Sequence, residues 1–335
     1  MIAPVPAEWS PHRAMWLGFP SHAELWEENL EPAQAETAAL ARALAGPGKE
    51  RVRLMVRGEA AETAARALLD DATGIEIVRG LFGDIWLRDT GPIFMERDGV
   101  FTAQAFRFNG WGGKYELEDD DIVAEQIAAA TGAPLRTAPC VMEGGALDHD
   151  GFGTVLTTRQ CLLNPNRNDG WSEVEAEAAL TASLGARAVL WLGDGLANDH
   201  TDGHVDNLAR FVAPGVVACP VAWGRNDPNA EVYDDAARRL AGMRGARGSA
   251  LTVARIASPG RIEDEDGTVL PASHMNFIIA NGAVIAPVYE TRAAAFALDT
   301  LQSLFPERTV IGLPSRALLS GGGSFHCISR EEPAA

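Results

Sequence analysis

Apolar and polar residues recur along the chain with two different periods. Six alanine-rich segments carry apolar residues at the three-to-four-residue spacing of an amphipathic helix: 31–45, 59–70, 118–130, 173–184, 231–243 and 292–305. Eight short runs rich in valine and isoleucine lie between them and predict strands: Val52–Val56, Ile75–Val78, Val155–Thr158, Val189–Leu192, Val216–Val221, Phe277–Ala280, Val284–Val288 and Val310–Leu313. Because predicted strands alternate with predicted helices, the pattern favours an α/β fold.

A weak internal repeat gives this pattern a longer period. Five segments share a polar turn that leads into a strand-like run: GDIWLRDTGPIFM, MEGGALDHDGFGTVL, TDGHVDNLARFVA, SHMNFIIANGAVI and GGGSFHCIS. One marker residue in each turn recurs at intervals of 54, 61, 72 and 51 residues: Asp89, Glu143, His204, Asn276 and Cys327. A period of about 60 residues predicts five copies of one β/α unit. Five such units can close into a ring with every turn directed at a central axis, so we expect residues 1–335 to form a single catalytic domain with one central site.

Composition indicates a soluble protein of the cytoplasm. Hydrophobic residues make up 47% of the chain, yet no apolar run approaches the roughly 20 residues that span a bilayer. The first residues, MIAPVPAEWSPHRAMW, lack the basic and apolar regions of a secretory signal. The formal charge of -18 argues against nucleic acid as a partner and permits attraction of cationic small molecules. Whether the chain forms a homo-oligomer is left open.

The four cysteines show neither C-x-x-C pairs nor zinc-like spacing, so we expect free thiols. Cys140, Cys161 and Cys219 lie in apolar or mixed surroundings, which are typical of buried, inert thiols. Cys327 differs because glycines at 321–323 precede it and allow close backbone approach. Since a thiol is intrinsically nucleophilic, Cys327 is a candidate nucleophile. The alternative is a small residue that begins a buried strand.

A dense polar segment, DHTDGHVDN at 199–207, supplies the candidate general acid/base. If a strand begins at Val205, His204 and Asp206 point to the same face of it. The carboxylate can then orient the imidazole and keep it basic, as a general acid/base requires. The simpler alternative is a turn rich in hydrogen-bonding side chains.

Two further turns and a glycine-rich loop add candidates. Trp86 and Asp89 lie in GDIWLRDTGP, and Glu143 precedes two glycines. Charged residues before glycine more often form solvated turns, which is the alternative here. Trp111 lies in FNGWGGK at 108–114, which we interpret as a mobile loop that can close over a site. An ordinary glycine-rich connection is the other interpretation.

Together, six sequence blocks resemble the agmatine deiminase family, part of the guanidine-modifying superfamily that includes the peptidylarginine deiminases. The blocks are DIWLRDTGP at 84–92, FNGWGGK at 108–114, EGG at 143–145, LLNPNRN at 162–168, TDGHVDN at 201–207 and GGGSFHC at 321–327. Each block is weak alone, but all six occur in the family's order over nearly the full length. The resemblance implies a five-bladed, pseudo-symmetric α/β propeller, the pentein fold, which agrees with the five-turn repeat.

The resemblance also implies a role for each matching residue. Cys327 corresponds to the family's nucleophile and His204 to its general acid/base. Asp89 and Asp206 match the carboxylates that hold the guanidinium, and Glu143 matches a third acidic residue at the site. The expected substrate-binding residues are Trp86, Asp89, Trp111, Glu143 and Asp206 from these blocks, together with His200, which directly precedes the block at 201–207.

The implied activity is hydrolysis of a C–N bond in a linear amidine, with agmatine giving N-carbamoylputrescine and ammonia as the first expectation. A planar guanidinium with forked N–H donors suits bidentate carboxylates, which hold its carbon in line with the sulfur. Cys327 attacks that carbon, and His204 protonates the departing ammonia. A covalent thiouronium remains until water, activated by His204, releases the ureido product. By analogy with the family, neither a metal nor an organic cofactor is needed.

One departure from the family leaves the rest of the substrate open. The family commonly has an acidic residue four positions before the catalytic histidine, where this chain has His200. A deiminase of free arginine or of a guanidino acid is therefore an alternative. An amidinotransferase shares the chemistry but fits the blocks less well.

Two alternative hypotheses do not involve cysteine-dependent cleavage of a guanidinium. A metal-dependent hydrolase is a rival because His200 and His204 are four residues apart, with Asp202 and Asp206 nearby as further possible ligands. Gly203 and the β-like residues that follow it argue against the helix that would align the two histidines. A non-catalytic binder of cationic metabolites is the other, although the intact cysteine, histidine and carboxylates count against it.

Overall fold

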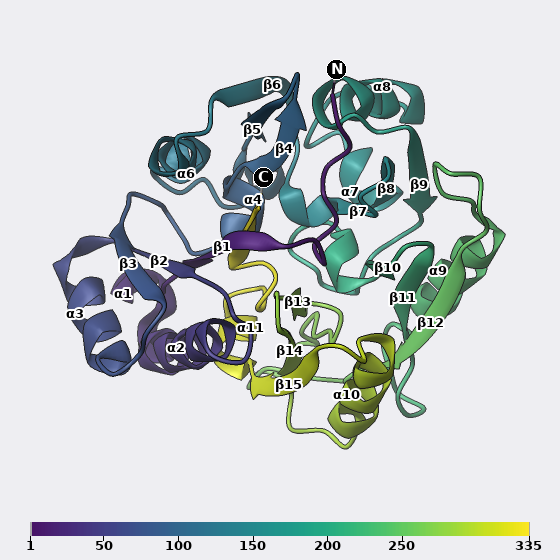
Figure 1. Ribbon diagram of the computed structural model, residues 1–335. Coiled ribbons are helices and arrows are strands. Elements are labelled where there is room, and N and C mark those ends of the chain that lie inside the picture. Colours follow the sequence, from purple (N-terminus) through teal and green to yellow (C-terminus); the bar gives the residue numbers. More distant parts are fainter. Residues whose placement is uncertain (1, 335) are drawn as a thin grey trace.

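The framework of the protein, a computed structural model that describes residues 2–334, consists of small β-sheets. Its strands are β1 (His12–Gly18), β2 (Val52–Val56), β3 (Ile75–Arg79), β4 (Ile93–Arg97), β5 (Val100–Arg107), β6 (Leu135–Val141), β7 (Asp148–His149), β8 (Thr154–Thr158), β9 (Ala188–Leu192), β10 (Arg210–Ala213), β11 (Val216–Val221), β12 (Thr252–Ala257), β13 (Ile278–Ile279), β14 (Ala283–Val288), β15 (Thr309–Pro314) and β16 (Ser329–Pro333). Within the described residues they form five sheets, in the orders β16-β1-β2-β3, β4-β5-β6, β7-β8-β9, β10-β11-β12 and β13-β14-β15. The sheets are arranged around the centre of the molecule (Figure 1).

Helices cover the outer side of these sheets, as Figure 1 shows. The longer ones are α2 (Leu30–Ala45), α3 (Gly58–Leu69), α6 (Val123–Thr131), α8 (Glu173–Leu184), α9 (Ala230–Gly242) and α10 (Ala293–Leu304). The short ones are α1 (Ala23–Trp26), η1 (Glu27–Asn29), α4 (Leu87–Thr90), α5 (Gly110–Gly113), η2 (Asp120–Ile122), η3 (Gly144–Ala146), α7 (Arg159–Leu162), η4 (Val205–Asn207) and α11 (Arg316–Ser320). Across residues 2–334, none of these helices has the length and apolar content needed to cross a bilayer.

One pairing pattern recurs in every sheet. The first strand pairs antiparallel with the second, and the second pairs parallel with the third. A longer helix connects the two parallel strands each time, because parallel neighbours cannot be joined by a tight turn. This β-β-α-β repetition confirms the α/β class and the predicted repeat. A closed five-bladed propeller and a single catalytic domain stay predictions.

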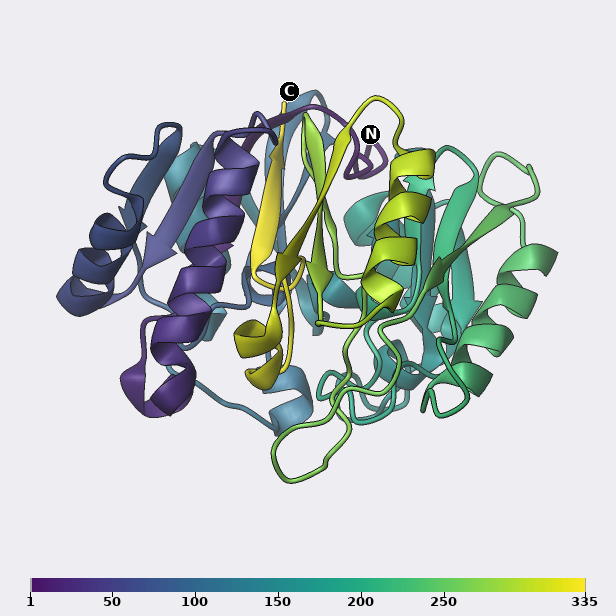
Figure 2. The same ribbon diagram turned by 90° about the horizontal axis from the view of Figure 1, so that it is seen from below.

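The two ends of the chain build one of the sheets together. Strand β16 pairs antiparallel with β1, with Leu17 opposite Ser329 and His12 opposite Pro333. Strand β1 pairs in parallel with β2 on its other side. The turn that carries Cys327 is therefore fixed against the first strand of the chain. Figure 2 shows that strands and longer helices run between the two faces of the molecule, so the turns that join them gather near those faces.

The helices agree closely with the sequence pattern. Five of the six predicted segments match helices of the described chain to within one residue at each end. The sixth, predicted at 118–130, begins at Val123 after the short η2 turn. Asp119 has a φ of 72°, in the left-handed region, and a helix cannot pass through such a residue.

The strands were predicted less completely. The eight predicted runs all coincide with strands, although the run at 277–280 keeps only the two residues of β13. Strand β5 was not predicted because Thr102 and Gln104 interrupt its apolar residues. Both are buried in the structure, where Gln104 Nε2 donates to the carbonyl of Ala105 at 2.8 Å and Thr102 Oγ1 donates to that of Val100 at 2.9 Å. Polar side chains can be buried in this way when they are hydrogen-bonded.

The predicted strand at Val205 is wrong. Residues 205–207 form the 3-10 turn η4, and strand β10 begins only at Arg210. Leu208 N and Ala209 N both donate to the carbonyl of Val205, at 2.9 and 2.7 Å, which closes the turn. His204 and Asp206 consequently do not share a strand face, and their placement has another cause.

Candidate active site

The five marker residues lie in turns that come just before the first strand of each sheet. Asp89 is in α4 before β4, and Glu143 precedes η3 and β7. His204 precedes η4 and β10, Asn276 precedes β13, and Cys327 precedes β16. Equivalent positions in repeated units lie at equivalent places around the molecule. The contacts described below show that these turns meet, which confirms the single meeting point expected from the repeat.

Gly145, in η3, lies where three of these turns converge. A Cβ atom at this position would lie 2.6 Å from His204 Nδ1, 2.8 Å from Asp89 Oδ1 and 3.2 Å from Asp206 Oδ2. The backbone N–H of Gly145 donates to Asp89 Oδ1 at 2.8 Å. A glycine is therefore required here by space, because a methyl group would displace the side chains that it faces.

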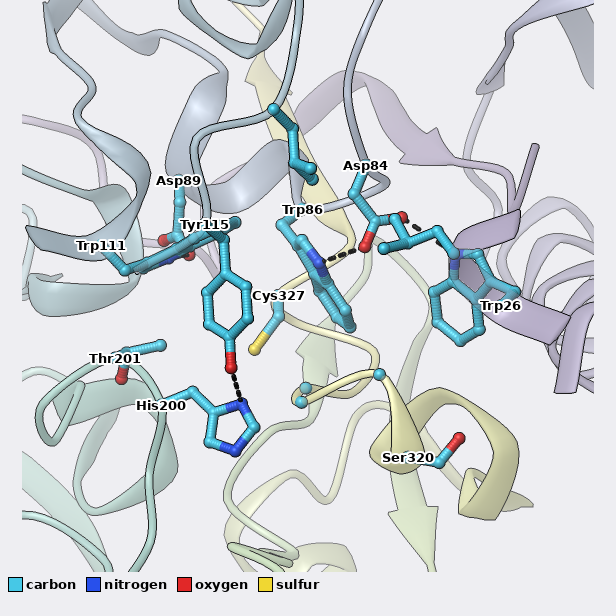
Figure 3. A pocket seen from close by; sticks show the side chains of 15 residues that line it. Trp26, Asp84, Trp86, Asp89, Trp111, Tyr115, His200, Thr201, Ser320 and Cys327 are labelled. Atoms are coloured by element: carbon cyan, nitrogen blue, oxygen red, sulfur yellow. Dashed lines mark hydrogen bonds between the residues drawn. The ribbon is translucent and has the colours of Figure 1, made fainter. Parts of the chain in front are cut away.

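A cavity of 220 Å³ opens above these turns (Figure 3). Its lining consists of Leu25, Trp26, Asp84, Trp86, Asp89, Trp111, Tyr115, Leu117, His200, Thr201, Ser320, Gly321, Gly322, Gly323 and Cys327. The predicted site residues Trp86, Asp89, Trp111, His200 and Cys327 thus face one cavity. The remaining three, His204, Asp206 and Glu143, are fully buried and belong, within the described chain, to the layer behind this lining.

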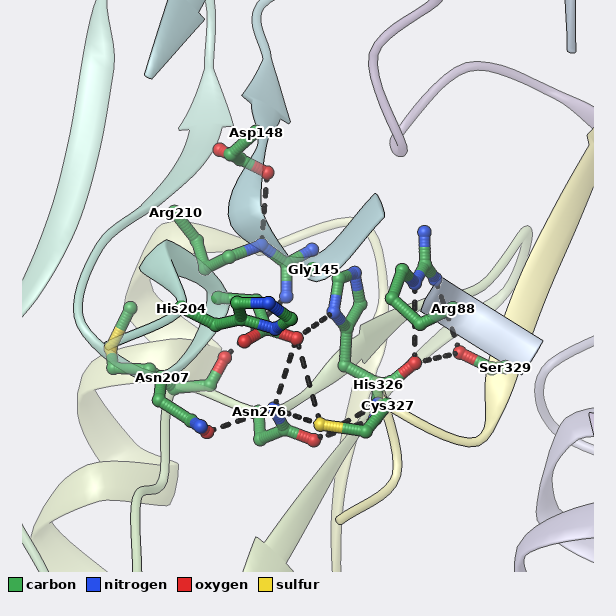
Figure 4. A network of polar contacts seen from close by, with 12 residues as sticks. Arg88, Gly145, Asp148, His204, Asn207, Arg210, Asn276, His326, Cys327 and Ser329 are labelled. Carbon is green, nitrogen blue, oxygen red and sulfur yellow. Dashed lines mark hydrogen bonds and ion pairs between the residues drawn. The ribbon is translucent and has the colours of Figure 1, made fainter. Parts of the chain in front are cut away.

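The Cys327 thiol, in its uncharged form, lies among polar side chains (Figure 4). Asn276 Nδ2 donates to Cys327 Sγ at 3.2 Å, and Sγ donates to Asp206 Oδ2 at 3.7 Å. Burial, followed by the charges of Asp206 and Asp89, raises the pKa of Cys327 well above its ordinary value. The thiol is therefore protonated at neutral pH, and a positive charge placed beside it would favour the thiolate.

Asp206 is anchored by a histidine that the sequence interpretation missed. His326 Nδ1 lies 2.7 Å from Asp206 Oδ2, and His326 Nε2 lies 3.1 Å from Glu8 Oε2. Burial alone would raise the pKa of Asp206, but the hydrogen bond to His326 and the neighbouring positive charges outweigh it and keep that pKa below its ordinary value. Asp206 therefore stays ionised beside Cys327. The available sequence signal was the adjacency of His326 to Cys327; Glu8 gave none.

His204 lies between two carboxylates, neither of which is Asp206. Its Nδ1 is 3.7 Å from Asp89 Oδ1, and its Nε2 is 3.9 Å from Glu143 Oε2. Burial alone would lower the pKa of this imidazole, but Asp89 and the other neighbours outweigh it and raise the pKa well above its ordinary value. His204 is therefore protonated at neutral pH. The expectation that Asp206 orients it is wrong, because that carboxylate pairs with His326 instead.

Glu143 is fixed from behind by Arg167, a residue of the LLNPNRN block to which no role was assigned. Arg167 Nε donates to Glu143 Oε1 at 2.7 Å, and both side chains are buried. Burial alone would raise the pKa of Glu143, but His204 and Arg167 outweigh it and lower the pKa. The same guanidinium contacts Asp202 Oδ2 at 2.5 Å. Asp202 is thus used to hold Arg167, not to face the cavity.

The loop at 108–114 is joined to the site by Trp111. Its indole Nε1 donates to Asp89 Oδ2 at 2.9 Å, which leaves both oxygens of that carboxylate with a donor. Trp111 adopts a φ of 54°, in the left-handed region, between glycines that also have positive φ. Asn109 Nδ2 donates to the carbonyl of Asn166 at 2.9 Å and fixes the start of the loop. The mobility predicted for this loop stays a prediction.

Aromatic side chains surround the outer part of the cavity. The Trp26 and Trp86 indoles donate to the two oxygens of Asp84, at 3.0 and 2.7 Å. Burial raises the pKa of Asp84 to about 6. On the opposite side, Tyr115 Oη lies 3.0 Å from His200 Nδ1, and the two rings are stacked. A cation extending from the cavity would meet aromatic faces and one carboxylate.

The histidines of the rival metal site are separated. His200 is exposed at the cavity mouth beside Tyr115, whereas His204 is fully buried. Among the described residues, the group of potential metal ligands that includes His204 consists of Glu143, Cys161 and His204. The ligand set that the rival interpretation assumed, His200 with His204, is therefore wrong.

Comparison with known proteins places these features in context. A sequence model of the Porphyromonas-type peptidyl-arginine deiminase family matches residues 4–333. The agmatine deiminase of Stutzerimonas stutzeri is 39% identical, over 98% of this chain and 95% of its own length. The solved agmatine deiminase of Enterococcus faecalis has a TM-score of 0.91 at 32% identity, over 98% of this chain and 95% of that one. A Cys-to-Ser variant of the C. jejuni agmatine deiminase, solved with substrate bound, has a TM-score of 0.90 at 25% identity. The match covers 100% of this chain and 97% of that one.

Proposed function

The chain belongs to the Porphyromonas-type peptidyl-arginine deiminase family, and from this premise we propose that it is a hydrolase that converts agmatine to N-carbamoylputrescine and ammonia. The proposal includes a single catalytic domain of five β/α repeats with one central site. The observation that carries it is the position of the Cys327 thiol, which faces the cavity and lies 3.7 Å from Asp206, while Asp89 lines the same cavity.

Substrate binding rests on the two aspartates. A guanidinium that enters the cavity meets Asp89 in the lining and Asp206 directly behind Cys327. Carboxylates accept the forked N–H groups of a guanidinium in pairs of charge-assisted hydrogen bonds. These bonds fix the central carbon next to the sulfur and supply the orientation that attack requires. The positive charge also stabilises the Cys327 thiolate, so binding and activation of the nucleophile are coupled.

The chemistry then follows from the protonation states. The thiolate attacks the guanidinium carbon, and a tetrahedral adduct forms. His204, whose raised pKa keeps it protonated, gives its proton to the leaving nitrogen, and ammonia departs. The product is a thiouronium bound to Cys327. Neutral His204 next takes a proton from water, and the water oxygen adds to the carbon as a hydroxyl group. The C–S bond then breaks while the hydroxyl proton passes to the sulfur, which releases the neutral ureido product and restores the Cys327 thiol. Glu143 holds His204 from behind.

The outer cavity favours a cationic tail over an anionic one. Asp84 lies between the Trp26 and Trp86 indoles, and aromatic faces attract an ammonium group. His200 favours a second candidate, a guanidino acid or free arginine, because its imidazole can donate to a carboxylate at a position where the family resemblance implies an acidic residue. The agmatine assignment rests on Asp84 and on the relatives; the alternative rests on His200.

An assay with a panel of guanidino compounds tests the proposal. We expect ammonia and ureido product from agmatine, with kcat/KM at least tenfold above that for free arginine, guanidino acids and an arginyl peptide. The matched variant is His200→Glu. If agmatine turns over poorly and His200→Glu improves it relative to the acids, the second candidate is correct. Absence of ammonia release from every compound would reject deimination itself.

A further inference from the structure

A cluster of metal-ligating atoms lies behind the cavity lining and shares His204 with the proposed reaction. Glu143, Cys161 and His204 each offer one ligand atom, and these atoms lie within 4.8 Å of one another. The three side chains are fully buried. In the proposed reaction the Cys161 thiol neither touches the substrate nor transfers a proton, so its place in this cluster is unexplained by deimination.

The local structure fixes Cys161 next to His204. Cys161 lies in α7, and its N–H donates to Thr158 Oγ1 at 3.4 Å. Thr158 Oγ1 in turn donates to the carbonyl of Gly203 at 2.6 Å, one residue before His204. One hydroxyl thereby connects the turn that carries the thiol with the turn that carries the imidazole. The two ligands are held by short-range bonds and do not depend on loop closure.

Within the described chain, three polar atoms of this cluster lack a hydrogen-bond partner, although the two histidine nitrogens face carboxylates at ion-pair distance. Glu143 Oε2, His204 Nδ1 and His204 Nε2 are buried and, among the described residues, make no hydrogen bond. Glu143 Oε1 is already bound to Arg167, so the second oxygen is the one left free for another contact. Buried polar atoms without partners are uncommon in folded proteins and indicate a missing ligand, water or ion.

The surroundings also resemble a metal site. His204 Nε2 lies 3.9 Å from Glu143 Oε2, while its other nitrogen faces Asp89 Oδ1 at 3.7 Å. A metal-bound histidine commonly presents its second ring nitrogen to a carboxylate, which fixes the ring. Ligand atoms around tetrahedral zinc lie about 3.5 Å apart, given bond lengths of about 2.0–2.3 Å. If the distance between His204 Nε2 and Glu143 Oε2 shortened by a few tenths of an ångström, these two atoms would reach that spacing.

We propose that Glu143, Cys161 and His204 form an inhibitory binding site for a thiophilic divalent cation, with Zn²⁺ as the best-fitting ion. Three protein ligands of mixed sulfur, nitrogen and oxygen type with one open position are a donor set that zinc accepts. Binding of the ion releases one proton from His204 and one from the Cys161 thiol to solvent, and the coordinated imidazole then cannot transfer protons between water and leaving group. The ion is an inhibitor and not a cofactor, because the proposed reaction has no step for it.

Binding is measured without turnover, so the result does not depend on the proposed function. The full chain is prepared as Cys327→Ser, which removes the cavity thiol, and is titrated with Cd²⁺ and Zn²⁺. We expect one ion per chain and a thiolate-to-cadmium absorption band. A Cys161→Ser substitution added to this chain should abolish the band and weaken binding at least tenfold, whereas Cys219→Ser, a matched buried thiol, should leave both unchanged.

Activity gives the second measurement. With agmatine as substrate, Zn²⁺ should inhibit the wild type, and Cys161→Ser should raise the inhibitory concentration at least tenfold while kcat/KM without zinc stays within about threefold. Should Cys161→Ser fail to fold, X-ray absorption at the zinc edge of the Cys327→Ser chain decides the ligands. One sulfur with nitrogen and oxygen ligands supports the site. Zinc without a sulfur ligand, or a cadmium band and inhibition that persist in Cys161→Ser, would overturn it.

Discussion

At the scale of single residues, the ionisation of Cys327 is expected to limit the proposed deimination. Its pKa is raised well above the ordinary value by burial and by two nearby aspartates. The thiol is therefore mostly protonated at pH 7. As long as the pH lies below the pKa, the fraction of thiolate rises about tenfold for each unit by which the pH increases. The substrate's positive charge has to shift this equilibrium.

The prediction is that a neutral alkylating agent and a cationic one behave differently. Alkylation of Cys327 by iodoacetamide should rise about tenfold per unit between pH 7 and 9, because thiolate is the reactive form. A haloacetamidine, which carries a guanidinium-like charge, should react much faster at pH 7. Mass spectrometry of the labelled peptides measures both, with Cys140, Cys161 and Cys219 as internal controls. A rate for iodoacetamide that is already constant below pH 7.5 would contradict the raised pKa.

The aspartates supply a second residue-scale prediction. Asp89→Asn and Asp206→Asn keep the size of the side chain but remove a charge that is proposed to hold the guanidinium. Each charge-assisted hydrogen bond contributes about 1.5–3 kcal/mol, or about one to two orders of magnitude in kcat/KM. We expect larger losses, because a displaced carbon also spoils the attack geometry. Asp169→Asn, at an exposed carboxylate, is the control. Losses below about threefold in both variants would exclude these residues from guanidinium binding.

At the scale of elements, the short helical turns before the first strands position the chemistry. Turn η3 is the most crowded, because a Cβ on Gly145 would come within 3.0 Å of His204 Nδ1 and Asp89 Oδ1. Gly145→Ala should displace these buried side chains and lower kcat/KM by about two orders of magnitude, with a stability loss of about 1–3 kcal/mol. Steady-state kinetics and denaturant unfolding measure the two effects.

The matched control for this substitution is Gly242→Ala at the end of α9. A Cβ there meets nothing within 4 Å, and the residue does not have positive φ. Activity should be unchanged, and stability should be equal or up to about 1 kcal/mol higher, because alanine favours a helix more than glycine. Equal activity of Gly145→Ala and the wild type would show that the turns tolerate displacement and do not set the geometry.

At the scale of the whole molecule, the N-terminal segment supports the site through Glu8. Its Oε2 contacts both His326 and the buried Arg210, and its Oε1 accepts from Ile279 N at 2.7 Å. Burial alone would raise the pKa of Glu8, but Arg210 and His326 outweigh it and lower the pKa well below its ordinary value. Residues from the beginning, middle and end of the chain thus share one buried charge network, part of which Figure 4 shows.

Glu8→Gln should therefore destabilise the protein in a pH-dependent way. Removing one partner of a buried ion pair costs about 3–5 kcal/mol, because Arg210 keeps its charge. Since the folded-state pKa of Glu8 is lowered, its contribution is complete above the unfolded-state pKa and is lost as pH falls through the folded-state value. The difference in unfolding free energy between wild type and Glu8→Gln should be full at pH 7 and shrink below about pH 4. Glu24→Gln, at an exposed position, is the control. A difference independent of pH would contradict this account.

Periodicity along the chain was sufficient to predict the repeat and the turns that carry the candidate reactive residues. Helical periodicity located five helices to within one residue, since each must bury one face against a sheet. The turns that carry Asp89, Glu143, His204, Asn276 and Cys327 were recognisable because polar residues and glycines interrupt apolar strands at a regular interval. A repeated unit necessarily returns its turns to equivalent places, so the central site followed from the period.

The hydrogen-bond and ion-pair partners of these residues could be identified only in the folded protein. Asp206 pairs with His326, 120 residues away, and not with His204, two residues away. Glu8 reaches His326 across 318 residues. Local patterns specify strands, helices and turns, whereas hydrogen-bond partners across the site depend on how five units are placed against one another. The strand predicted at Val205 failed for a different reason: residues 205–207 close a 3-10 turn through local hydrogen bonds, and so short a turn leaves no periodic signal in the chain.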